Sequence, residues 1–78
     1  MSVDRVFTVW TVYESPSDFP GWWVLRAHDV VPGQPEPIPR EEWHAASSLE
    51  QVRVALPPGL TCLPRQPDDD PVIYETWI

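Results

Sequence analysis

Two neighbouring stretches, VFTVWTVYE at residues 6–14 and WWVLRAHDVV at residues 22–31, decide the fold of this chain. Both are rich in β-branched and aromatic residues, which favour extended backbone, and their alternate side chains would point to opposite faces of a strand. Between them, SPSDFPG combines two prolines with Gly21, which can adopt a positive φ, so the chain is expected to reverse there. The two stretches therefore predict an antiparallel hairpin.

The next stretch, PGQPEPIP at residues 32–39, is dominated by proline. Four prolines in eight residues exclude a helix and a central strand, because proline has no backbone N–H to donate. We expect a surface connector over these residues, with no recognition role, and a short edge strand over residues 42–46.

One short helix is predicted to follow this edge strand. Ser47 begins an S-x-x-E pattern with Glu50, which is typical of a capping box, and PPG at residues 57–59 ends the helix. The residues expected on its buried face are Leu49, Val52 and Leu56. Residues 60–63 and 72–78 predict two more strands. The expected fold is α+β, an antiparallel sheet of four to five strands with one short helix packed on one face, in a single domain spanning residues 1–78.

The composition is strongly acidic. Twelve acidic residues against five arginines and no lysine give a formal net charge of -7. Such a charge repels nucleic acid and anionic lipid and attracts arginine- and lysine-rich protein surfaces, so we expect a basic protein or nucleoprotein partner and no direct nucleic-acid or membrane binding. Some of the arginines are expected to form internal salt bridges, since a guanidinium suits bidentate pairing. We find no signal peptide and no apolar run of the roughly 20 residues that span a membrane, which predicts a location in the host cytoplasm.

The sequence offers no set of residues for catalysis, metal binding or a cofactor. Cys62 is the only cysteine, which excludes an internal disulfide, and with His28 and His44 it leaves too few ligands for structural zinc. Cys62 lies in a short apolar run, so a buried, inert thiol is favoured over a nucleophile. We therefore expect no enzyme activity, no metal and no cofactor.

The densest charge is DDD at residues 68–70, bracketed by two prolines. Two interpretations stay open. One is a solvated turn whose charges keep neighbouring strand edges from aggregating. The other is a partner-binding site, in which further carboxylates on the same side of the molecule imitate the phosphates of a nucleic acid. The residues assigned to that site are Asp68, Asp69, Asp70, Glu75, Glu14, Asp18, Glu41 and Glu42, with Trp22 as an aromatic anchor and Glu36 as a further carboxylate.

Five tryptophans are more than so small a core needs, so we expect at least one to be partly exposed. Trp22 and Trp23 are adjacent and would point to opposite faces of a strand, so only one of them can lie under the helix. An exposed aromatic patch also suits self-association, and a homodimer formed through the tryptophan-bearing sheet is the alternative to a foreign partner.

Three segments resemble a family of small proteins from bacteria and their phages. They are TVYESPSDFPGWWVLRAHDV at 11–30, SSLEQVRVALPPGLTCLPR at 47–65 and DDDPVIYETWI at 68–78. Most of the residues in these motifs are structural. In size, charge and lack of catalytic residues the chain is similar to phage anti-CRISPR proteins that inhibit type I surveillance complexes, type I-C among them. The resemblance implies binding where the crRNA-guided complex receives target DNA, so that duplex entry and the seed heteroduplex are blocked.

Overall fold

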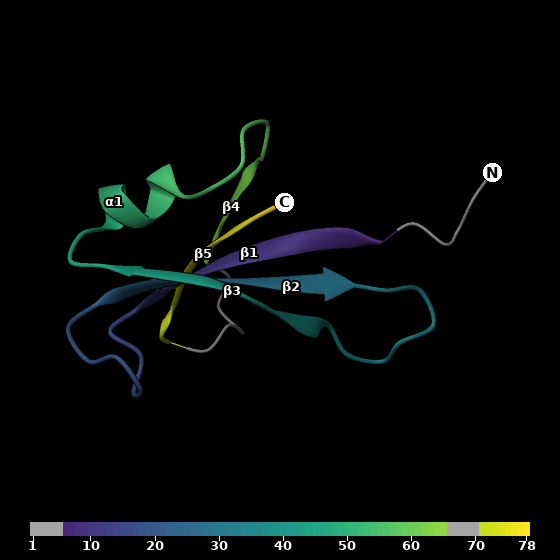
Figure 1. Ribbon diagram of the computed structural model, residues 1–78, viewed down its shortest axis with the longest axis horizontal. Helices are drawn as coiled ribbons and strands as arrows, with labels where there is room; N and C mark the ends of the chain where they lie inside the picture. The colour runs from purple at the N-terminus through teal and green to yellow at the C-terminus, as the bar shows by residue number, and fades with distance from the viewer. Residues whose placement is uncertain (1–5, 66–70) are drawn as a thin grey trace.

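The computed structural model describes residues 6–65 and 71–78. Its elements are β1 (Phe7–Glu14), β2 (Trp23–Val30), β3 (Ile38–Ala46), α1 (Leu49–Val54), β4 (Cys62–Pro64) and β5 (Ile73–Trp77). The five strands form one antiparallel sheet in the order β3-β2-β1-β5-β4, and α1 lies over one face of it (Figure 1). The α+β prediction and the predicted order of elements are confirmed.

β1 is the central strand, and it pairs with β2 on one side and β5 on the other. The β1–β2 hairpin pairs without interruption from Phe7 opposite Val30 to Glu14 opposite Trp23, as the alternation of the two stretches predicts. Gly21, in the turn, has φ +83°, a conformation that side-chain-bearing residues rarely adopt. The hairpin is thus the framework to which the other strands are added.

The hydrophobic core lies between this hairpin and α1. Trp10 and Val12 of β1, Leu25 and Ala27 of β2, and Val52 of α1 are all buried. Val12 and Leu25 pair directly, as do Trp10 and Ala27, so both pairs point to the helix side of the sheet. Around them pack half-buried apolar side chains, among which are the predicted helix residues Leu49 and Leu56.

The helix begins one residue later than predicted. Ser48 is the N-cap, with extended backbone at φ -138° and ψ 153°, and its hydroxyl accepts a hydrogen bond from the backbone N–H of Gln51. Ser47 and Ser48 each have Glu or Gln three residues on, so the sequence pattern suits either cap. β3 continues to Ala46, which pairs with Trp23, and Ser47 is left as the link. The helix has only six residues and ends at Val54, before Leu56 and the PPG stop.

β3 also begins earlier than predicted, inside the proline-rich stretch, because it is an edge strand. Pro39 lies opposite His28, where a missing N–H is tolerated if it faces away from the partner strand. The pairing shifts register between Arg26 and His28, which accommodates the extra β3 residues as a bulge. The last two strands are shorter than the expected ranges of 60–63 and 72–78.

A carboxylate buried beneath the helix joins α1 to β5. The side chain of Glu75 is 4% exposed and receives two hydrogen bonds from Arg53, from Nε to Oε2 at 2.9 Å and from Nη2 to Oε1 at 2.5 Å. The indole N–H of Trp77 donates a third, at 2.6 Å. The bonds from Arg53 are the main reason that the pKa of Glu75 is lowered; burial opposes them.

Replacing Arg53 should lower the free energy of unfolding by more than replacing Glu75 does. Arg53→Met leaves the buried Glu75 carboxylate without its cation, and we expect a loss of about 2–3 kcal/mol in the free energy of unfolding. Glu75→Gln leaves the half-exposed Arg53 to be hydrated and retains an acceptor for Trp77, so we expect a smaller loss of about 1–2 kcal/mol. Urea unfolding followed by tryptophan fluorescence measures both, and an equal or reversed order would contradict this account.

The same pair predicts a pH dependence of stability. A carboxyl whose pKa is lowered by folding adds stability that is complete above its ordinary pKa of about 4.5 and is lost as the pH falls through the folded-state pKa. Wild-type protein should therefore lose more stability than Glu75→Gln when acidified below about pH 4.5. Urea midpoints of both proteins between pH 7 and pH 3 give the comparison, and parallel curves would show that Glu75 does not contribute.

Candidate functional site: the open face of the sheet

The sheet face opposite α1 is covered by no helix of the described chain, and we call it the open face. Strand alternation places on it Val9, Thr11 and Tyr13 from β1 and Val24, Arg26 and His28 from β2. Two loops border it: the β1–β2 turn at residues 15–22, which curls away from the helix side in Figure 1, and the β2–β3 loop at residues 31–37. Side chains from three strands and two loops therefore meet on this face.

The β1–β2 turn folds back over one end of the open face. Phe19 packs against Trp43 of β3, with ring centroids 5.1 Å apart, and Asp18 forms a 2.6 Å ion pair with Arg26 of β2. Within the turn, Pro16 is buried. The turn predicted from SPSDFPG therefore does more than reverse the chain, because it also shields part of the sheet.

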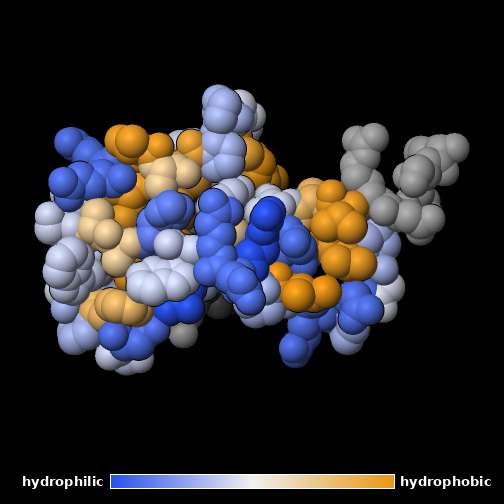
Figure 2. Space-filling view, viewed as in Figure 1, coloured by the Kyte–Doolittle hydropathy of each residue, from blue (hydrophilic) through white to orange (hydrophobic). Residues whose placement is uncertain are grey.

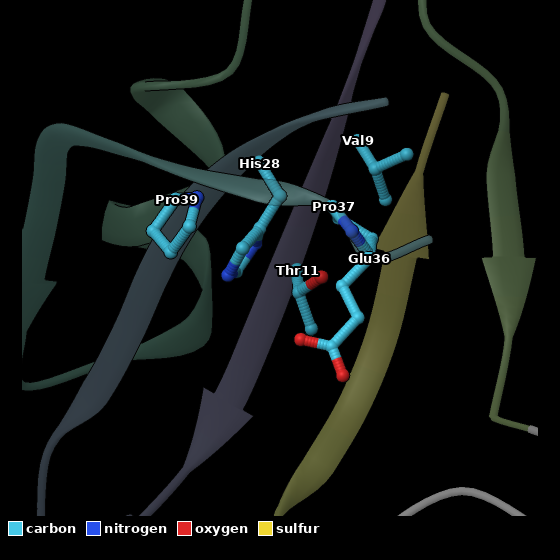
Figure 3. Close-up of a pocket in the computed structure, with 6 residues that line it drawn as sticks. All are labelled: Val9, Thr11, His28, Glu36, Pro37 and Pro39. Atoms are coloured by element: carbon cyan, nitrogen blue, oxygen red, sulfur yellow. The ribbon is translucent and has the colours of Figure 1, made fainter. Parts of the chain in front are cut away.

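Beside the β2–β3 loop, a groove of about 500 Å³ remains open (Figure 3). It is lined by Val9 and Thr11 of β1, His28 of β2, Pro39 of β3, and Glu36 and Pro37 of the preceding loop. Figure 3 shows Glu36 reaching from the loop across the sheet toward Thr11. The lining is mainly apolar, with a hydroxyl, an imidazole and a carboxylate as its polar groups.

A second depression adjoins the groove, and His28 lines both. Its other lining residues are Tyr13, Pro16, Ser17, Asp18, Arg26 and Val72. The Asp18–Arg26 ion pair lies here, so this depression already contains a carboxylate and a guanidinium in contact. The two depressions together follow β1 and β2 along the open face.

The carboxylates assigned to a partner site do not share one face. Asp18 is on the open face, and alternation along β3 puts Glu41 there too, while Glu42 points to the helix side, 4.0 Å from His44. Glu14 is exposed at the end of β1, opposite Trp23. Asp68, Asp69 and Asp70 lie outside the described residues. Glu36 lines the groove of the open face, so the described members of the set lie partly on that face and partly elsewhere.

Glu75 corrects the expectation most directly. We assigned it to the partner site, but its carboxylate is buried and hydrogen-bonded to Arg53 and Trp77. It stabilises the packing of the helix and presents no surface to a partner.

Three arginines form internal ion pairs, as the composition predicted. Arg26 pairs with Asp18, Arg53 with Glu75, and Arg40 lies 3.7 Å from Asp29. Thr8 donates to Asp29 at 2.8 Å and accepts from Arg40 at 3.4 Å, which links β1, β2 and β3 on the helix side. By contrast, several exposed carboxylates form no ion pair within the described chain: Glu14, Glu36, Glu41 and Glu50.

The tryptophans divide between core and surface, which confirms that at least one is partly exposed. Trp10 is buried, and Trp23 packs on the core and meets Tyr74 edge-on at 5.0 Å. Trp22 and Trp43 are 48% and 47% exposed. Of the adjacent pair, Trp23 packs on the core, whereas Trp22 lies in the turn before β2 and is exposed.

A further apolar surface lies at the end of the sheet where β1 begins, as Figure 2 shows. Val6, Phe7 and Ile38 are each about half exposed there, and Val30 lies opposite Phe7. This surface carries none of the residues assigned to the partner site.

The structure keeps Cys62 away from both histidines. Cys62 is in β4 and His44 in β3, which are the two opposite edges of the sheet, while His28 is on the open face. Cys62 is exposed rather than buried as expected, but desolvation, with a smaller contribution from nearby Glu75, raises the pKa of its thiol. Within residues 6–65 and 71–78, no group of three or more metal-ligating side chains occurs.

The comparisons with known proteins found no match to a family model, to a curated protein or to a solved structure. No helix in the described part of the chain has the length and apolar character needed to cross a membrane. Functional inference therefore depends on the open face itself.

The sequence did not identify the groove. The sequence gives Val9, Thr11 and His28 no feature beyond the ordinary alternation of a strand. Glu36 was named as a further carboxylate of the partner site, but its loop was expected to be a plain connector. The only sequence signal for the groove was a carboxylate, Glu36, among four prolines. The shape of the groove depends on how that loop packs on the sheet, and the local sequence does not determine this packing.

The contact between Phe19 and Trp43 should hold the turn on the open face. We expect Phe19→Ala to lower the free energy of unfolding by about 1–2 kcal/mol, through lost apolar burial and the lost ring contact. The matched control is Trp22→Phe, a change at an exposed aromatic residue of the same turn, which should cost less than about 0.5 kcal/mol. Urea unfolding measures both variants, and equal costs would show that the turn is held in another way.

Proposed function

We propose that this chain is a small, non-catalytic acidic protein that acts by occupying a basic surface of a partner. More specifically, we propose an inhibitor of phage or mobile-element origin that binds a CRISPR type I surveillance complex, of type I-C, and blocks its binding of target DNA. The identity of the partner rests on the sequence resemblance alone. The structural support concerns how the charges of the chain are distributed.

The observation that carries the proposal is the asymmetry between paired and unpaired charges. Arg26, Arg40 and Arg53 are neutralised by carboxylates of their own chain, whereas exposed glutamates such as Glu36 and Glu41 are not paired. The formal charge of -7 is thus presented to a partner with few accessible cations among the described residues. Long-range attraction to a basic surface follows from this distribution.

Such a protein would compete with nucleic acid for the same arginines and lysines of the complex. A surveillance complex holds its guide–target heteroduplex in a positively charged channel and recognises it through the backbone. Carboxylates placed against these cations would take the place of the phosphates. Inhibition would then require one copy of the protein per site and no chemical turnover. The separation of Cys62 from His28 and His44 supports a non-catalytic role.

A DNA-binding assay with purified type I-C complex tests this proposal. Adding the protein near one equivalent should abolish binding of fluorescent target DNA. The variant with Asp68, Asp69 and Asp70 all changed to Asn should inhibit roughly tenfold less well at low ionic strength, and the difference should shrink as salt screens the charges. Glu50→Gln, which neutralises one exposed carboxylate on the helix, is the control. Intact DNA binding at saturating protein would overturn the proposal, and unchanged inhibition by the triple variant would overturn charge mimicry.

A second candidate is an accessory protein that self-associates through its tryptophan-bearing sheet. The observation in its favour is the exposure of Trp22 and Trp43. Light scattering of the purified protein separates the two candidates. An assembly that persists on dilution, in the absence of any other protein, favours self-association, whereas a monomer favours a foreign partner.

A further inference from the structure

The groove on the open face combines an apolar lining with polar groups that the chain itself leaves unpaired. The Thr11 hydroxyl, the His28 imidazole and the Glu36 carboxylate form no hydrogen bond or ion pair within the described residues. Around them lie Val9 and two prolines. A ligand that fits this lining has an apolar stem and a cationic, hydrogen-bond-donating end.

We propose that this groove binds an arginine side chain of the partner protein, an inference that rests on the proposed function. The methylene stem of arginine would lie on Val9, Pro37 and Pro39, as long basic side chains do on apolar surfaces. The guanidinium would donate to Glu36 and Thr11 and stack on the ring of His28. Its planar fork has five donors, so it can serve several acceptors where an ammonium group acts as a compact charge.

The adjoining depression shows the same arrangement within the chain. There Arg26 donates from Nη2 to Asp18 Oδ2 at 2.6 Å, and His28 lines that depression as well. The groove, which shares His28 with that depression, has a carboxylate, Glu36, without an arginine of its own. His28 thus lines both a depression that already holds a guanidinium and a groove that does not.

Other ligand classes fit the groove less well. An anion would be repelled by Glu36, and a purely apolar ligand would bury three polar groups without partners. A metal ion would find only His28 and Glu36 as good ligands, and no group of three metal-ligating residues occurs in the described chain. A basic side chain satisfies both the charge and the apolar lining.

The test is an NMR titration of the full chain with a blocked pentapeptide that carries one central arginine between glycine and alanine residues. Amide shifts should concentrate at residues 9–11, 28, 36, 38 and 40, since Pro37 and Pro39 have no backbone N–H. Glu36→Gln preserves the size of the side chain and removes its charge, and should weaken binding about three- to fivefold, as expected for one partly exposed ion pair. The matched control is Glu50→Gln, an exposed carboxylate on α1, and its affinity should equal that of wild type. Shifts spread over all acidic residues, or equal affinity for both variants, would overturn the proposal.

Changes in the peptide test the chemistry of the ligand. Citrulline in place of arginine keeps the shape without the charge and should abolish the shifts at the groove. Lysine should bind more weakly than arginine, and equal binding would overturn the assignment to a guanidinium. Free arginine should bind more weakly than the peptide, and binding as strong as that of the peptide would indicate a small-molecule site and overturn the proposed protein partner.

The same variants separate this inference from the proposed function. If Glu36→Gln inhibits the surveillance complex as well as wild type does, the groove does not contact that partner and this inference fails, while the proposed function stands. If the arginine peptide binds at the groove but the complex retains its DNA, the choice of partner fails and the arginine site stands.

Discussion

The ion pair between Arg53 and Glu75 is the interaction on which the arrangement of this protein depends. A helix of six residues is too short to be stable by itself, so α1 must be held by its contacts with the sheet. Val52 supplies the buried apolar contact, and Arg53 reaches to β5 on the far side of β1. The pair thereby ties a helix that packs over β2 and β3 to the other half of the sheet.

In that arrangement α1 covers one face of the sheet, and only loops cover part of the other face. The open face is shielded at one end by the β1–β2 turn, through Phe19 and Asp18, and is bordered by the proline-rich loop next to the groove. Loops of this kind can form a binding surface without disturbing the core, because their polar groups face solvent. Glu75, by contrast, is a buried carboxylate that stabilises the packing of the helix on the sheet. The charge of an acidic residue in this chain is therefore not enough to assign its role.

The prediction succeeded where one local pattern dominated. The hairpin, the order of elements and the buried face of the helix all follow from alternation or helical periodicity. It was less accurate where two choices were locally equivalent, as with Ser47 and Ser48 at the helix start. It was wrong about Glu75 and about the extent of β3, since burial and edge position depend on which strands become neighbours.

The sequence by itself determined the strand-forming segments, the helix, the turns between them and the excess of negative charge, because these depend on residues close together in the chain and on composition. Only the tertiary structure decided which carboxylates are neutralised, which tryptophans are exposed and where a groove forms. Those properties depend on residues far apart in sequence, such as Arg53 with Glu75 and Glu36 with Thr11, which become neighbours only when the strands take their order in the sheet.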